Sequence, residues 1–181
     1  MARLMRRIQK SAAVPPGTVE YVGEKRAEQV KITVFDFEES RLEEKELATI
    51  EECLPYRDTP RVSWINIDGL HDTEALEKLG VHFGLHPLVL EDIVTTHQRP
   101  KVEDHQDYLY IVLKMLEYPE GSEQLAADQI SIVLGRNFVL SFQERQGDVW
   151  DPVRERIRKG AGHHRRAGAD YLSYTLIDAI V

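Results

Sequence analysis

Three closely spaced strand signals in the second half of the chain constrain the fold more than any other feature. The segments 108–117, 129–134 and 138–143 are rich in β-branched, aromatic and other apolar residues. Only three residues, beginning with Gly135, separate the last two segments, which is typical of a tight hairpin. A second turn signal, around Gly121, lies between the first two. These segments predict an antiparallel meander against which the other elements must pack.

Alternating hydrophobicity earlier in the chain predicts further strands. The segments 18–22 and 30–37 form a predicted strand pair across a charged turn. In the second of these, Asp36 shares a face with the apolar residue Val34. The segment 61–67, with the sequence RVSWINI, predicts another strand. After the turn around His97, a proline marks the entry into a strand.

Capping residues and apolar stripes predict five helices. The first begins at a capping box at Ser40 and ends at Pro55. The other four begin at or beside residues suited to a helix start: Asp72, Pro87, Asp151 and Ala169. The last helix, 169–181, stops without a capping residue, which favours a fragment of a longer chain over a terminal helix packed on its own domain.

The order of these elements, β-β-α-β-α-α-β-β-β-α-α, defines the expected fold class. We expect an α/β (α+β-like) fold with a mixed, partly antiparallel sheet, helices on both faces and a truncated C-terminal helix pair. A length of 181 residues with 42% hydrophobic and 30% charged residues suits one soluble globular domain. The expected parts are a flexible basic tail (1–14), the α/β domain (15–146) and the C-terminal helices (147–181).

Charge and composition exclude several classes of function. The net charge of −8 argues against nucleic acid as a partner. No apolar run is long enough to cross a membrane, and the basic N-terminus lacks the apolar core of a signal peptide. The single cysteine, Cys53, excludes an internal disulfide framework. Because no catalytic motif is present, neither a nucleophile elbow nor a phosphate loop nor a zinc cysteine cluster, the sequence does not predict an enzyme.

A cluster of basic residues follows Asp151. The segment 154–166 holds Arg154, Arg156, Arg158, Lys159, Arg165 and Arg166 with only Glu155 to oppose them. Two interpretations are open. The cluster contacts an acidic surface of a partner, such as another subunit, or it is a solvated helix face.

Two adjacent acids, Glu91 and Asp92, stand on the short apolar helix that begins at Pro87. A carboxylate set among packed apolar residues needs a cation or a hydrogen-bond donor. Neighbouring helical residues project about 100° apart, so each acid is expected to give one oxygen to a site that another element or chain completes. Asp178, alone in an apolar run, is a third candidate. Mg²⁺ is often held by one or two carboxylates, but ordinary surface charge or an ion pair is the open alternative.

Long stretches of the sequence resemble the cytoplasmic N-terminal domain of the CorA magnesium transporter family. The most specific are HPLVLEDI and HQRPKVE, within the segment 86–103. SWINIDGLHD, DYLYIVLKML, GDVWDPVRERIR and ADYLSYTLIDAIV add to the resemblance, which runs from about Val14 to Val181. The family's stalk helix, two membrane helices and Gly-Met-Asn signature find no match in this sequence.

The resemblance implies a function and a set of ligands. Family members are homopentameric channels of the inner or plasma membrane, and this chain would be the cytoplasmic part, whose last helices lead to the stalk. The resemblance implies that Mg²⁺ is both the regulatory ligand and the transported ion, with Co²⁺ as a further cargo. A related transporter of Zn²⁺, Co²⁺ or Ni²⁺, or a stand-alone soluble scaffold domain, stays open as an alternative.

The resemblance also assigns roles to the candidate acids. In the family, divalent ions bind between neighbouring cytoplasmic domains and hold the channel closed. The residue matching Asp92 binds such an ion together with an aspartate of the neighbouring stalk helix. A second site uses the residues matching Glu91 and Asp178 with a backbone carbonyl near Val14. The four predicted metal ligands are therefore Asp92, Glu91, Asp178 and the carbonyl of Val14.

Overall fold

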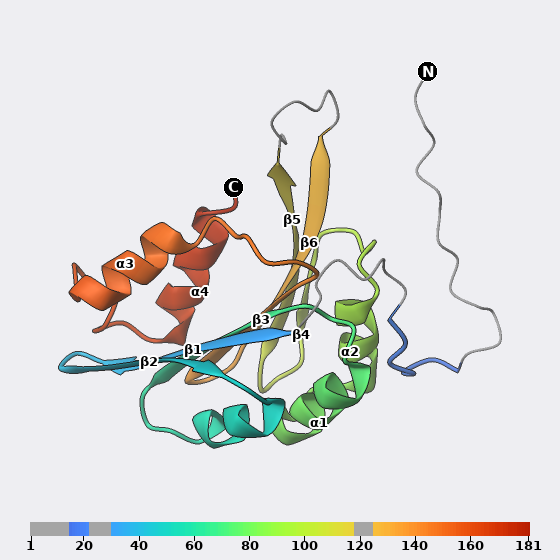
Figure 1. The fold of residues 1–181 in the computed structure, drawn as a ribbon, viewed down its shortest axis with the longest axis horizontal. Helices are drawn as coiled ribbons and strands as arrows, with labels where there is room; N and C mark the ends of the chain where they lie inside the picture. The colour runs from blue at the N-terminus through green and yellow to red at the C-terminus, as the bar shows by residue number, and fades with distance from the viewer. Residues whose placement is uncertain (1–14, 22–29, 118–124) are drawn as a thin grey trace.

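The computed structural model describes residues 15–21, 30–117 and 125–181. Over these residues the chain forms a seven-stranded sheet in the order β2-β1-β3-β7-β6-β5-β4 (Figure 1). All neighbouring strands are antiparallel except β3 and β7, which are parallel. The strands are β1 (Lys31–Glu38), β2 (Arg41–Leu47), β3 (Val62–Asp68), β4 (Lys101–Asp104), β5 (Leu109–Glu117), β6 (Ala126–Leu134) and β7 (Phe138–Gln143). The mixed sheet confirms the predicted fold class.

Helices cover both faces of this sheet, as the sequence predicts. One face carries the 3₁₀ helix η1 (Ile50–Arg57) with α1 (Thr73–Phe83) and α2 (Pro87–Val94), while the other carries α3 (Asp151–Lys159) and α4 (Ala169–Asp178) (Figure 1). No helix in the described part of the chain is long and apolar enough to cross a membrane.

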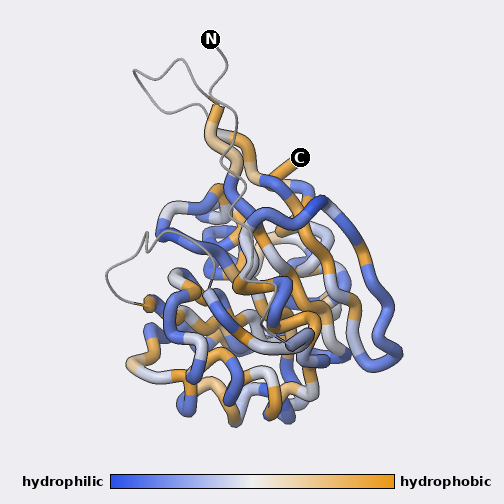
Figure 2. Tube along the Cα trace, turned by 90° about the vertical axis from the view of Figure 1, so that its right-hand side faces the viewer, coloured by the Kyte–Doolittle hydropathy of each residue, from blue (hydrophilic) through white to orange (hydrophobic). Residues whose placement is uncertain are grey.

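Each face of the sheet has its own hydrophobic core. On the η1–α1–α2 face, strand residues such as Ile65 and Leu140 pack against Leu79 and Ile93 from the helices. On the α3–α4 face, Trp64 and Trp150 are both fully buried among strand and helix side chains. Figure 2 shows apolar (orange) residues interspersed with polar (blue) ones along the trace. Because a strand sends successive side chains to opposite faces, the central strands supply apolar residues to both cores.

Local signals placed most elements correctly. The Asp72 side chain accepts a hydrogen bond from the Ala75 amide at 3.1 Å and caps α1. Gly84, with φ of 72°, ends α1 in the left-handed conformation that glycine adopts without strain. The predicted hairpin joins β6 and β7, and the Gly135 amide donates to the Phe138 carbonyl at 2.9 Å. The turn predicted around Gly121 lies outside the described residues.

The helix predicted from Ser40 to Pro55 is wrong. Residues 41–47 form β2, and Pro55 lies inside η1 instead of ending a helix. Glu38 pairs with Arg41, so Ser40 occupies the turn of a β1–β2 hairpin and does not cap a helix. The hairpin satisfies the backbone groups along one edge of β1, and the gain from this strand pairing outweighs the capping pattern.

The strand predicted at 18–22 is also not observed. Residues 18–21 have no strand structure, although the Val19 side chain is buried in the core on the η1–α1–α2 face. Val22 lies outside the described residues. Both edges of β1 are already taken, one by β2 and the other by β3. The segment therefore packs on the fold by its side chains without joining the sheet at β1.

A buried carboxyl at the end of β3 predicts how stability depends on pH. Asp68 accepts hydrogen bonds from Asn66 Nδ2 (2.9 Å) and Gln143 Nε2 (2.6 Å), and burial raises its pKa from 3.8 to about 6. The folded chain thus holds this proton more tightly than the unfolded chain does, so stability falls as the pH rises from about 4 through about 6.

Asp68→Asn is therefore expected to stabilise the fold by on the order of 2 kcal/mol at a pH of about 7.5, with the gain vanishing toward a pH of about 4. The amide oxygen of asparagine still accepts both hydrogen bonds. Urea unfolding across this pH range measures the effect. Asp107→Asn, at an exposed position, is the control and should change little. A gain that did not depend on pH would contradict this role of Asp68.

Candidate functional site

Local sequence fixes the helix that carries the two candidate acids. His86 Nδ1 accepts a hydrogen bond from the Leu88 amide at 3.2 Å, and Pro87 occupies the first turn of α2. The helix buries Val89, Leu90, Ile93 and Val94 against the sheet. Glu91 and Asp92 are only half-buried, at the border between the core and solvent. The apolar stripe therefore orients α2 so that both carboxylates remain accessible.

Asp92 forms an ion pair within its own chain. Its Oδ2 lies 2.6 Å from Lys101 Nζ, and the two side chains are 21% and 28% exposed. The Asp92 backbone carbonyl accepts a hydrogen bond from Gln129 Nε2 at 3.1 Å, which ties α2 to β6. The ion pair that the sequence left open as an alternative is thus present at this residue.

Lys101 is the residue near the candidate site that sequence reasoning missed. Its Nζ also lies 2.8 Å from Glu103 Oε1, so one ammonium lies between two carboxylates. Burial favours the neutral amine, but the hydrogen bonds to Asp92 and Glu103 outweigh it, and the pKa of Lys101 is raised. The available signal was the strand after His97, in which Lys101 and Glu103 share a face.

A hydrogen bond to the β4–β5 turn holds the start of α2, and aromatic stacking orders that turn. The His105 and Tyr108 rings are stacked, with centroids 4.8 Å apart, and the Tyr108 hydroxyl accepts a hydrogen bond from the His86 amide at 2.9 Å. His105 Nε2 also lies 3.4 Å from Glu103 Oε2. The helix is therefore fixed at its N-cap, His86, and again at Asp92, which preorganises the two acids.

Glu91 contacts the N-terminal segment of the described chain. Its Oε2 accepts a hydrogen bond from the Gly17 amide at 2.5 Å. The same segment packs closely here, since a Cβ at Gly17 would lie 3.2 Å from Pro87 Cβ. Val14, the fourth predicted ligand, lies outside the described residues.

Asp178 is not brought to the acids of α2 within one chain. It is the exposed last residue of α4, which covers the opposite face of the sheet. Among the residues that the structure describes, no group of three or more His, Cys, Asp or Glu side chains is placed to hold a metal ion.

The basic cluster after Asp151 is matched largely by acids of its own chain. Arg154 contacts both Asp148 oxygens at 2.7 and 2.6 Å, and Arg158 contacts both Glu44 oxygens at 2.8 and 2.7 Å. Bidentate pairs of this kind fix α3 to its own domain. These ion pairs neutralise two of the arginines in the basic cluster of segment 154–166.

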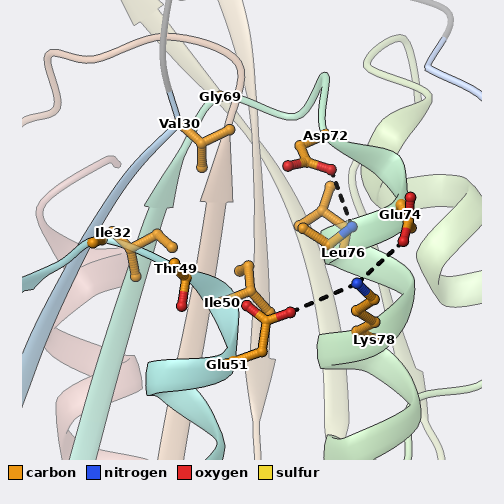
Figure 3. Close-up of a pocket in the computed structure, with 12 residues that line it drawn as sticks. Val30, Ile32, Thr49, Ile50, Glu51, Gly69, Asp72, Glu74, Leu76 and Lys78 are labelled. Atoms are coloured by element: carbon orange, nitrogen blue, oxygen red, sulfur yellow. Dashed lines mark hydrogen bonds and ion pairs between the residues drawn. The ribbon is translucent and has the colours of Figure 1, made fainter.

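A cleft of about 280 Å³ lies between η1 and α1 (Figure 3). Lys78 lies between two of the acids that line it, with Nζ 3.6 Å from Glu51 and 3.1 Å from Glu74. Asp72, the third acid, caps α1. All three carboxylates of this cleft therefore have partners within the chain, and we assign no cation site to it.

Comparison with known proteins connects this geometry to a family. Residues 60–181 match the family model described as CorA-like Mg²⁺ transporter protein. The chain is 47% identical, over 176 residues, to the cobalt/magnesium transport protein CorA of Thermotoga maritima. The match covers 97% of this chain and 50% of that protein. The chain thus spans about half the length of this relative.

Two solved structures share the fold. Full-length CmaX matches with a TM-score of 0.65 and 18% identity, covering 87% of this chain and 47% of that chain. The soluble domain of CorA from Methanocaldococcus jannaschii matches with a TM-score of 0.56 and 19% identity, covering 82% of this chain and 55% of that chain. At these identities the likeness establishes the fold alone.

Proposed function

Because this chain belongs to the CorA-like Mg²⁺ transporter family, we propose that it is the cytoplasmic, divalent-cation-sensing domain of a CorA-type transporter. The cargo is Mg²⁺ and, by analogy with the Thermotoga relative, Co²⁺. In this proposal Mg²⁺ is also the regulatory ligand. The domain works on the cytoplasmic side of the inner or plasma membrane, as part of a homopentamer. Its role is regulatory, not catalytic.

One observation carries the sensing role: two adjacent, half-buried carboxylates stand on a helix that is fixed at both ends. Glu91 and Asp92 offer oxygen ligands, which Mg²⁺ prefers. Contacts from Tyr108 and Gln129 hold α2 in place. A site with so few protein ligands binds weakly, which suits a sensor that responds to changes in the concentration of free cation.

A second chain would complete each site. The acids of α2 project in different directions, and the described residues of one chain contain no cluster of three ligands. We propose that Asp92 shares its cation with a neighbouring subunit. Glu91, Asp178 and the Val14 carbonyl contribute to a second site. The hydrogen bond from Gly17 to Glu91 supports this grouping, because Gly17 is only three residues from Val14.

The regulatory mechanism follows from electrostatics. Acidic edges of neighbouring subunits repel each other, and a shared dication removes that repulsion and stabilises the symmetric, closed assembly. Loss of the cation restores the repulsion and favours an open or asymmetric state. The net charge of −8 per chain adds to this tendency.

Asp92→Ala in the transporter that carries this domain is expected to weaken closure by internal Mg²⁺. Because one of few ligands is lost, the half-inhibiting Mg²⁺ concentration should rise on the order of tenfold, equivalent to about 1.4 kcal/mol. Transport into vesicles loaded with graded Mg²⁺ measures it. Glu77→Ala, at an exposed helical acid in α1, is the matched control. Equal inhibition of the parent and Asp92→Ala would contradict the proposed sensing site.

A further inference from the structure

Lys101 forms an ion pair with Asp92, the carboxylate that the proposed function assigns to a divalent cation. Its Nζ lies 2.6 Å from Asp92 Oδ2 and 2.8 Å from Glu103 Oε1. Asp92 belongs to α2 and the other two residues to β4, so the ammonium links two elements. The Tyr110 ring lies beneath it, with Nζ 5.5 Å from the ring centroid. The lysine is therefore held in a defined position and is not a freely moving surface charge.

A dication that binds Asp92 must compete with this ammonium. Both are positive, and both need the same carboxylate oxygens at short range, so their simultaneous binding is opposed by repulsion. The side chains of Lys101 and Asp92 are only 28% and 21% exposed, so water screens this repulsion less than it would at a fully exposed pair.

Resting on the proposed function of the site, we propose that Lys101 is a tethered competitor that sets the concentration at which a divalent cation binds Asp92. In the cation-free chain the ammonium neutralises Asp92. When a dication binds, the ammonium leaves Asp92 and keeps its contact with Glu103, which is already within hydrogen-bond distance. Glu103 is thus the alternative partner that makes the exchange reversible. The competition raises the cation concentration needed for binding, so the sensor responds only when the divalent cation is abundant.

Lys101→Met tests this proposal, since methionine has a similar length and no charge. Titration of the 181-residue chain with Mg²⁺, and separately with Co²⁺, by calorimetry and by thermal shift measures binding without any transport assay. We expect Lys101→Met to bind at least tenfold more tightly than the parent chain. The gain should disappear in Lys101→Met/Asp92→Asn, because the released carboxylate is the ligand.

Lys78→Met is the matched control. Lys78 also lies between two carboxylates, Glu51 and Glu74, so its replacement changes the net charge by the same amount at a different place. It should leave the cation affinity unchanged. Lys101→Arg keeps the charge and should show no gain, while Lys101→Ala serves as a second neutral variant should the methionine variant not fold.

The measurements distinguish the competition by Lys101 from the binding of a cation at Asp92, on which it rests. If Asp92→Asn weakens binding but Lys101→Met binds no more tightly than the parent, the cation site stands and the competition does not. If Lys78→Met gains as much as Lys101→Met, the effect is one of net charge and the competition is again wrong. If no variant of the chain shows binding that depends on Asp92, the competition is wrong, whereas the proposed function is decided by the transport measurement on Asp92→Ala.

Discussion

Trp150→Ala is expected to lower the free energy of unfolding by about 3–5 kcal/mol. Trp150 is fully buried, and its ring packs edge-on against Trp64 with centroids 5.6 Å apart. Its Nε1 donates a hydrogen bond to the Leu176 carbonyl of α4 at 2.9 Å. Alanine would leave a cavity between the sheet and the two C-terminal helices. It would also deprive a buried carbonyl of its donor.

Urea unfolding measures this loss, with Tyr174→Ala as the control. Tyr174 is also an aromatic residue, on α4, but it is 60% exposed. Its replacement should change the free energy of unfolding by less than about 0.5 kcal/mol. Equal effects of the two variants would show that Trp150 does not anchor α4. Trp150→Phe should fall between them, because phenylalanine keeps much of the ring but loses the hydrogen bond to Leu176.

Asp36→Ala is expected to cost about 3–5 kcal/mol, a loss of similar size with a different cause. The carboxylate is fully buried at the end of β1, where it forms an ion pair with Arg61. It also accepts hydrogen bonds from Ser63 Oγ at 2.8 Å and Thr59 Oγ1 at 3.2 Å. Removing it takes the shared acceptor from three donors, of which Ser63 is fully buried and cannot be hydrated instead.

Glu38→Ala is the control, because Glu38 lies two residues further along β1 and is exposed. It should change the stability by less than about 0.5 kcal/mol. A double-mutant cycle with Arg61→Ala isolates the ion pair. The double variant should be less destabilised than the sum of the two single variants, since each single change leaves the other charge without its partner. Strictly additive losses would contradict the coupling of Asp36 and Arg61.

Elements with strong local signals were predictable from sequence. The starts of α1 and α2 depend on Asp72 and on Pro87 with its preceding histidine, all within one turn of the helix that they begin. The β6–β7 hairpin depends on a three-residue turn that begins with Gly135. In each case the residues that specify the element are neighbours in the sequence.

Features that depend on pairing in the assembled sheet were not predictable. The capping pattern at Ser40 is real as a local preference, but residues 41–47 pair with β1 instead of forming a helix. In the same way, Asp36 was placed on an apolar face, while its partner Arg61 lies 25 residues further along the chain. Which strand edges are free, and which charge reaches which, depends on the assembled sheet.

The candidate site also combines features that the local sequence determines with features that only the fold determines. By itself the sequence determined that Glu91 and Asp92 stand on one short apolar helix, because caps and apolar spacing act over only a few residues. Only the tertiary structure decided that Lys101 returns on β4 to pair with Asp92, and that Asp178 ends a helix on the opposite face of the sheet. The physical reason is that charges interact through space, and the distances between them are set by strand pairing and helix packing, not by their separation in the sequence.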